Sequence, residues 1–364
     1  MTTHRLDAGS RASSHTQGMF DFSVVTRGAL LLVVCAPFLA MAGHERQASP
    51  SGLPTALAYH PDALLHDAGE HHPENPQRVR AVLSRLRAAR LWDKLLQLEP
   101  HPAPEAVLRL VHTPDYLAEL RAATRDAPVQ IDPDTRASMG SYRAVKAALG
   151  AVLGAANAVA RGRARNAFAL VRPPGHHAFA DQGGGFCLIN YVAVAARHLQ
   201  REHSIERILI VDWDAHHGNG TQAIFYDDPS VLYFSIHQYP YYPGTGAATE
   251  TGRGQGRGTT INVPLAAGAG DDEAIAAFRR RLVPAARSFR PQWVLISAGF
   301  DGHRADPLAH LQLTAAGYAK LTRIVMNIAD KYADGALVSV LEGGYQPVAL
   351  ARSVAAHIDM LSRR

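Results

Sequence analysis

The sequence contains very little cysteine, with only Cys35 and Cys187 among 364 residues. The two lie far apart and in different surroundings, so they cannot build a disulfide framework or a cysteine-type zinc site. Any metal that this chain binds must therefore be held by histidine, aspartate or glutamate.

The sequence also lacks a sustained basic block, although its formal net charge is +5. Lysine and arginine are interspersed with acids over most of the length, so charge does not indicate a nucleic-acid partner. The Gly/Arg segment 252–258 has no interleaved aromatic residues, and we interpret it as a flexible loop. With 47% hydrophobic and 19% charged residues, the composition is that of a globular protein.

A long membrane-spanning run is missing from the N-terminal region. The apolar stretch 28–40 follows Arg27 and leads into Ala40-Met41-Ala42, a small-x-small pattern typical of a signal-peptidase site. It is too short to span a bilayer comfortably. We predict that residues 19–42 are a cleaved signal peptide and that the mature protein is periplasmic without a stable membrane anchor. The alternative is a cytoplasmic protein preceded by residues translated in error.

From residue 55 onward, short β-branched and apolar runs alternate with longer stretches of helical period. This alternation predicts an α/β fold in which helices flank a parallel sheet. No linker-like composition break interrupts it, so we divide the chain into a signal-peptide-like segment (1–42), a linker (43–54) and one large domain (55–364). The predicted strands are 56–59, 167–171, 207–211, 231–236, 259–263, 293–297 and 336–341, and the predicted helices are 142–160, 190–203, 272–289 and 313–333.

Five predicted strands are followed at once by polar residues that are costly to bury without a purpose. In open parallel sheets, ligands bind outside the carboxyl ends of the strands, so these side chains are expected to meet in one place. A single such residue is more often a cap or a turn residue, but five coincident strand ends favour an active site. The polar segments are 172–177, 212–220, 237–239, 298–301 and 342–345.

The second of these segments has metal-ligand spacing. Asp212, Asp214 and His216 alternate, so in an extended chain they point to one side, and Asp214 and His216 can share a metal. Asp301 from another strand end completes a set of one imidazole and two carboxylates, which leaves a position open for water. This set favours zinc, although ferrous iron or manganese also accept it.

Two further segments supply groups that move or donate protons. His176 and His177 follow Pro-Pro-Gly, which restrains the backbone and orients both imidazoles for proton transfer. Tyr345 follows two glycines, and its phenol can donate a hydrogen bond to a developing oxyanion. Neither signal is specific by itself.

Taken together, these motifs resemble the zinc-dependent histone deacetylases and their bacterial relatives, which include the acetylpolyamine amidohydrolases. The resemblance runs from about residue 59 to the C-terminus. It implies the three-layer arginase/deacetylase fold, with an eight-stranded parallel sheet flanked by helices. The matching segments are HPENPQR (72–78), RPPGHH (172–177), GFCLIN (185–190), DWDAHHGNGT (212–221), SAGFD (297–301) and EGGY (342–345).

The resemblance also implies a role for each site residue. Asp214, His216 and Asp301 hold zinc. His177 is the general base and then the general acid, and His176 beside it assists. Asp212 orients the ring of His176, Asn219 orients the ring of His177, and Tyr345 stabilises the oxyanion. Gly185, Phe186 and Tyr242 line the acyl tunnel, while a structural potassium ion binds at Asp212, Asp214, His216, Ser235 and Ile236. Asn219 and the EGGY segment are typical of class II. Tyr191 departs from the usual second asparagine, and either Asp132 or Asp134 is the acid at the tunnel rim.

The expected activity is hydrolysis of an acetyl amide, most simply Nε-acetyl-lysine, to acetate and an amine. Polyamine-specific relatives carry a glutamate seven positions after the second metal-binding aspartate, where this chain has Leu308. A leucine disfavours a second substrate cation, yet an acetylpolyamine amidohydrolase remains the alternative. An arginase-like ureohydrolase lacks support because its additional metal-binding aspartates are missing, and a non-catalytic binding protein is a remote alternative. The sequence leaves the oligomeric state open.

Overall fold

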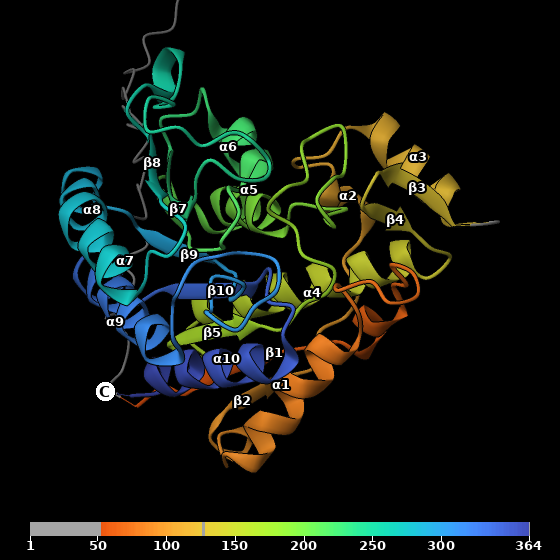
Figure 1. Cartoon of the computed structure of the whole chain (residues 1–364), viewed down its shortest axis with the longest axis horizontal. Coiled ribbons are helices and arrows are strands. Elements are labelled where there is room, and N and C mark those ends of the chain that lie inside the picture. The colour runs from red at the N-terminus through yellow and green to blue at the C-terminus, as the bar shows by residue number, and fades with distance from the viewer. Residues whose placement is uncertain (1–51, 126–127, 364) are drawn as a thin grey trace, which may run out of the picture. The chain divides into compact units, whose positions relative to one another are not determined.

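An eight-stranded sheet forms the centre of the computed structural model, which describes residues 52–125 and 128–363 (Figure 1). The strand order is β2-β1-β5-β10-β9-β6-β7-β8, and every neighbouring pair is parallel. The predicted signal peptide lies outside the described residues. The strands are β1 (Thr55–Ala58), β2 (Leu96–Leu98), β5 (Asn166–Ala169), β6 (Ile208–Asp212), β7 (Val231–Gln238), β8 (Thr260–Leu265), β9 (Trp293–Ala298) and β10 (Leu337–Leu341), with β3 (Val129–Asp132) and β4 (Thr135–Ala137) forming a separate antiparallel pair.

Helices cover both faces of this sheet, so the fold has three layers (Figure 1). On one side α4 packs against α5 and the central strands, and on the other α10 packs between α1 and α9. Helix α4 is apolar and long enough to span a membrane, but 72% of its most apolar 18-residue window is buried in the protein, as expected for a core helix. The helices are α1 (Gln77–Ala88), α2 (Glu105–Leu108), α3 (Pro114–Ala123), α4 (Ser141–Ala160), α5 (Tyr191–His203), α6 (Asn219–Phe225), α7 (Asp271–Ala277), α8 (Val283–Phe289), α9 (Ala315–Tyr332) and α10 (Pro347–Leu361), with short helical turns η1 (Pro61–Leu65), η2 (Trp92–Lys94), η3 (Gly254–Gly256) and η4 (Phe278–Leu282).

The predicted α/β fold with an eight-stranded parallel sheet is confirmed. All seven strands predicted from the sequence occur, with ends shifted by at most two residues. The eighth, β2, has only three residues and is partly exposed at the sheet edge, so its apolar pattern is weak. The helix predicted over 272–289 forms as three consecutive segments, α7, the π-helical turn η4 and α8.

Strand register brings the polar segments to one edge of the sheet. Asp212 at the end of β6 pairs with Ser297 in β9 and with Ser235 in β7. Leu341 at the end of β10 pairs with Ala298 in β9. The segments that follow β6, β9 and β10 therefore leave the sheet side by side, which places their side chains around one point.

Candidate active site

Three predicted metal ligands meet where the segments after β6 and β9 come together. The donor atoms of Asp214, His216 and Asp301 all lie within 4.8 Å of one another. His216 Nδ1 is 3.2 Å from Asp214 Oδ1 and 3.0 Å from Asp301 Oδ2. The structure thus brings one imidazole and two carboxylates together from positions 87 residues apart in the sequence, Asp214 and Asp301.

Each carboxylate of this cluster is held by backbone through its other oxygen. Asp214 Oδ2 accepts a hydrogen bond from the Gly343 N–H at 2.8 Å, and Asp301 Oδ1 accepts one from the Ala215 N–H at 2.8 Å. These bonds orient the remaining oxygens, Asp214 Oδ1 and Asp301 Oδ2, toward His216. Outer hydrogen bonds of this kind are typical of metal ligands, because they fix the geometry of the donor atoms.

The hydrogen-bond partner of His216 tests whether the cluster fits a metal. His216 Nε2 lies 3.1 Å from the carbonyl oxygen of Leu308, which can only accept, so Nε2 carries a hydrogen. In the neutral ring, Nδ1 then directs its lone pair at two carboxylate oxygens. That arrangement needs a shared cation, either a proton on Nδ1 or a metal ion. The donor set and its orientation therefore fit a divalent metal.

Charges within the cluster are strongly coupled. Burial and the neighbouring Asp214 carboxylate raise the pKa of Asp301 to about 7. Burial by itself would raise the pKa of Asp214 as well, but the His176 and His216 imidazoles outweigh it and lower that pKa. Two buried carboxylates that share one small volume require a positive charge between them, which a divalent cation supplies.

Glycines allow the backbone to approach these carboxylates closely. A Cβ atom at Gly299 would clash with Asp214 Oδ2, and one at Gly343 would clash with Asp301 Oδ2. Any larger residue at either position would displace a carboxylate of the candidate metal site. These two glycines of the SAGFD and EGGY segments are thus part of the site for steric reasons.

The two adjacent histidines have different partners. His176 Nδ1 lies 3.0 Å from Asp212 Oδ2, whereas His177 Nδ1 lies 2.8 Å from the amide oxygen Oδ1 of Asn219. Because the amide oxygen only accepts, Nδ1 of His177 is protonated and the Nε2 lone pair is free. The imidazole centroids are 4.1 Å apart.

These partners separate the pKa values of the two histidines. Burial lowers the pKa of His176, but the carboxylates of Asp212 and Asp214 outweigh it and raise that pKa to about 10. Burial and the adjacent imidazoles of His176 and His216 lower the pKa of His177 well below its usual value. At neutral pH, His176 is therefore a cation and His177 is a neutral base.

Tyr345 is held from two sides at the end of the EGGY segment. Its backbone N–H donates to Asp306 Oδ2 at 2.6 Å, and the Arg78 guanidinium carbon lies 4.8 Å from its ring centroid. Arg78 also donates from Nε to the Gly344 carbonyl at 2.7 Å. Burial raises the pKa of Tyr345 well above 10, so its hydroxyl stays protonated and can donate a hydrogen bond.

A cavity of about 260 Å³ connects these groups to the surface. Of the two candidates for a rim acid, Asp134 lines the cavity, whereas Asp132 Oδ2 accepts from the Gly185 N–H at 3.1 Å and supports the wall. The lining residues are Asp134, His177, Gly185, Phe186, His216, Tyr241, Tyr242, Leu308 and Tyr345. Every predicted tunnel residue is in this set. Tyr241 was not predicted, although the aromatic run 239–242 was a signal for it.

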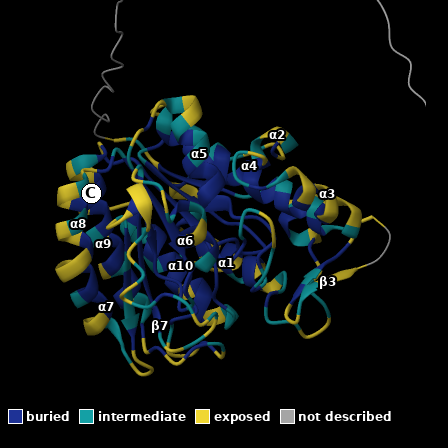
Figure 2. Cartoon of the chain, turned by 90° about the horizontal axis from the view of Figure 1, so that it is seen from above, coloured by how far each residue is buried: buried dark blue, intermediate teal, exposed yellow. Residues whose placement is uncertain are grey.

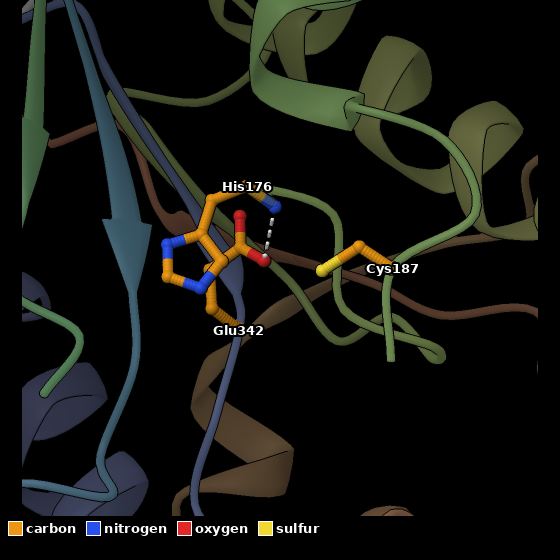
Figure 3. A group of neighbouring side chains, drawn as sticks. All are labelled: His176, Cys187 and Glu342. Atoms are coloured by element: carbon orange, nitrogen blue, oxygen red, sulfur yellow. Dashed lines mark hydrogen bonds between the residues drawn. The ribbon is translucent and has the colours of Figure 1, made fainter. Parts of the chain in front are cut away.

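A second group of potential metal donors comprises His176, Cys187 and Glu342 (Figure 3). Glu342 Oε2 accepts hydrogen bonds from the backbone N–H groups of Gly175, at 2.6 Å, and of His176, at 3.1 Å. Its other oxygen accepts from Ser297 Oγ at 3.1 Å. Glu342 therefore already ties the segment that carries the two histidines to β9, and we assign this group a structural role that the sequence did not reveal.

Tyr191, the departure from the family pattern, lies at the start of α5 and is fully buried. A Cβ atom added at Gly175 would be 2.8 Å from Tyr191 Cδ2, so the ring packs directly behind the segment that carries His176 and His177. It is not among the residues that line the cavity.

At its strand ends, the parallel sheet gathers a cluster of one imidazole and two carboxylates that could hold a metal ion, two oriented histidines and a phenol, an arrangement that fits metal-assisted hydrolysis. Residues 72–361 match the histone deacetylase domain. The chain belongs to the histone deacetylase family, and it is an enzyme that acts on acetylated amides.

Several proteins are similar to this chain in sequence or structure. The chain is 41% identical over 293 residues to a probable deacetylase of Archaeoglobus fulgidus, covering 80% of this chain and 81% of that protein. It is 37% identical over 309 residues to the histone deacetylase-like amidohydrolase of Pseudomonas aeruginosa, covering 80% and 81%. It is 40% identical over 327 residues to the polyamine deacetylase HDAC10 of Homo sapiens, covering 84% of this chain but only 48% of that protein. The crystal structure of the HDA15 HD domain superposes with a TM-score of 0.81 at 38% identity, covering 85% and 88%.

Proposed function

We propose that this enzyme is a zinc-dependent deacetylase that hydrolyses Nε-acetyl-lysine-type amides to acetate and a free amine. The observation that carries the proposal is the cavity in which His177, His216 and Tyr345 face one volume. That volume lies beside the buried Asp214 and Asp301 carboxylates. An acyl carbonyl placed there meets a base, an oxyanion donor and a metal site at once.

Zinc suits the donor set because it accepts histidine nitrogen and carboxylate oxygen and leaves a position open. Ferrous iron is a second candidate, since mixed nitrogen and oxygen ligands do not discriminate strictly. We also propose a structural potassium ion near Asp212, Asp214, His216, Ser235 and Ile236. The adjacency of Asp212 and Ser235 across β6 and β7 supports this placement.

Asp214, His216 and Asp301 would hold the zinc ion, which would supply Lewis acidity toward the acyl carbonyl and lower the pKa of water. His177 Nε2 accepts the proton of the attacking water while Nδ1 keeps its hydrogen bond to Asn219. The positive charge on His176, which Asp212 maintains, stabilises negative charge as it develops beside it. The Tyr345 hydroxyl donates a hydrogen bond to the carbonyl oxygen as that oxygen becomes anionic.

Collapse of the tetrahedral species then breaks the carbon–nitrogen bond. The protonated His177 returns its proton to the departing nitrogen, which leaves as a neutral amine and becomes an ammonium ion in water. The water oxygen remains on the acyl carbon, so the second product is acetate. One water is consumed in each turnover, and His177 returns to its neutral form.

Two observations bear on the substrate, and they point in different directions. Leu308 lines the cavity, so no carboxylate at this position can offset the desolvation of a second substrate cation. The likeness to human polyamine deacetylase HDAC10 supports the alternative, an acetylpolyamine substrate, although the chain spans only about half of that protein. Leu308 belongs to this chain's own cavity, so we favour a singly charged acyl amide.

The test is a comparison of kcat/KM for an acetyl-lysine peptide and for acetylspermidine on the metal-analysed enzyme. We expect one zinc per chain and a preference for the peptide. A strong preference for acetylspermidine would overturn the substrate assignment but leave the deacetylase assignment intact. Absence of turnover on both substrates by zinc-loaded protein would contradict the proposed activity.

A further inference from the structure

A second cavity, of about 650 Å³, lies between α7, η4 and α8 on one side and α9 on the other. It is larger than the active-site cavity and shares no lining residue with it. A volume of this size lies within the range of pockets that enclose small organic molecules. These helices carry exposed positions on the outside of the protein, where a ligand has access (Figure 2).

Helical spacing explains how the two walls arise. Arg279, Val283 and Arg287 recur every four residues through η4 and α8, and therefore share one face. Lys320, Ile324 and Ile328 have the same spacing on the facing side of α9. The π-helical turn η4 inserts one additional residue per turn between α7 and α8, and such turns are frequent at functional sites.

The charge of the lining is entirely positive. Its five ionised side chains are Arg279, Arg287, Lys320, Arg323 and Lys331, and no aspartate or glutamate lines the cavity. Within residues 52–125 and 128–363, none of these five forms an ion pair. Arg323 Nε donates to Met360 Sδ at 3.1 Å, and Lys331 Nζ lies 5.4 Å from the Tyr332 ring centroid, but neither contact supplies a counter-ion. Five cations without an acidic partner around one cavity favour an anionic ligand.

The rest of the lining is mostly apolar. Val283 is 38% exposed, although burial of a valine side chain would stabilise the protein. Ile324 and Tyr332 are also only partly buried, and Ile275 and Ile328 contribute to the floor between the helices. A ligand that satisfies this site needs an apolar body as well as an anionic group.

The arrangement of the lining favours a thin, extended ligand. From Lys320 to Lys331 the α9 wall extends about 16 Å along the helix axis. The apolar side chains of Ile324, Ile328 and Tyr332 lie along this wall, and cations lie at both of its ends, at Lys320 and Lys331. A single hydrocarbon chain can contact these apolar side chains along its length while its anionic end reaches a cation.

We propose that this cavity binds a single-chain anionic amphiphile, specifically a fatty carboxylate. Its hydrocarbon chain lies along the apolar side chains of α9, and its head group pairs with the surrounding arginines and lysines. Binding at this site is independent of the deacetylase reaction, because no metal-binding or proton-transfer residue lines it.

The test is calorimetric titration of the full-length protein with dodecanoate below its micelle concentration. We expect saturable binding, with dodecylammonium, which has the same chain and opposite charge, and acetate, which lacks the chain, each binding at least tenfold more weakly. Equal affinity for dodecylammonium would overturn the role of the cations. Binding of anionic vesicles or of an acidic peptide in the absence of dodecanoate binding would overturn the choice of ligand.

Charge reversal supplies a matched control. Arg287→Glu/Lys331→Glu should weaken dodecanoate binding at least tenfold. Arg280→Glu/Arg281→Glu makes the same charge change at exposed positions beside the cavity that do not line it, and should change affinity less than twofold. Equal losses in both pairs would show a general charge effect and refute the site. If the first pair does not fold, Arg287→Gln/Lys331→Gln replaces it, and deacetylase activity reports the fold of each variant.

Discussion

Replacing Gly343 by alanine should damage the metal site without altering any ligand. Gly343 donates its N–H to Asp214 Oδ2 at 2.8 Å, and an added Cβ atom would lie 2.6 Å from that oxygen. The same atom would clash with Asp301 Oδ2. One methyl group therefore presses on both carboxylates, while the backbone conformation itself remains open to alanine because Gly343 has no positive φ.

The size of the effect follows from the distances. A carbon and an oxygen need about 3.4 Å, so the 2.6 Å contact with Asp214 Oδ2 requires a displacement of about 0.8 Å. Ligand positions in metal sites tolerate only about 0.2 Å. Disturbing an outer contact of a metal ligand typically costs 10- to 100-fold in affinity. Displacing both carboxylates should cost at least 100-fold in zinc affinity, with a parallel loss of activity.

The assay is zinc titration with elemental analysis, alongside turnover of an acetyl-lysine peptide. Gly154→Ala is the matched control, because its Cβ would meet Pro100 Cβ at an ordinary 3.4 Å within α4. This control should bind zinc normally and gain up to about 1 kcal/mol of stability from its helix propensity. Wild-type zinc affinity and activity in Gly343→Ala would refute the steric argument for the site.

Four further predictions can be tested separately. Asp301→Ala should lose zinc and activity together, whereas Tyr345→Phe should keep zinc and lose about a hundredfold or more in kcat; zinc loss in Tyr345→Phe would contradict the division of roles. Leu308→Glu should shift kcat/KM toward acetylspermidine by about 1 to 3 kcal/mol, and Leu308→Gln, its neutral control, should not. Burial lowers the pKa of His357 to about 3, so below pH 6.5 the folded state binds fewer protons than the unfolded state. As the pH falls below 6.5, this residue should therefore lower the free energy of unfolding by about 1.4 kcal/mol per pH unit. In urea unfolding experiments, the free energy of unfolding of His357→Asn should depend less steeply on pH than that of the wild type. If residues 19–42 are a signal peptide, mass spectrometry of protein from its native host should find an N-terminus near Gly43, and an intact Met1 would contradict export.

Much of the site was accessible from the sequence because its residues directly follow predicted strands. The sequence groups Asp214, His216 and Asp301, since parallel strands deliver their carboxyl ends to one edge of a sheet. The edge strand β2 and the helix α10 were not predicted. The three residues of partly exposed β2 are too few to show a periodic pattern. Helix α10 begins at Pro347, directly after the EGGY segment, which we interpreted as a functional loop and not as the start of a helix.

By itself, the sequence placed the polar side chains of the candidate site directly after predicted strands, and its motifs indicated the family. Local periodicity and motif spacing contain that information. Only the tertiary structure decided how those groups face one another. It set which oxygen of Asp214 points at His216, placed Asp134 rather than Asp132 in the cavity, and enclosed a basic cavity between α8 and α9. The reason is physical, because each of these features depends on packing between segments far apart in the chain, which no local pattern encodes.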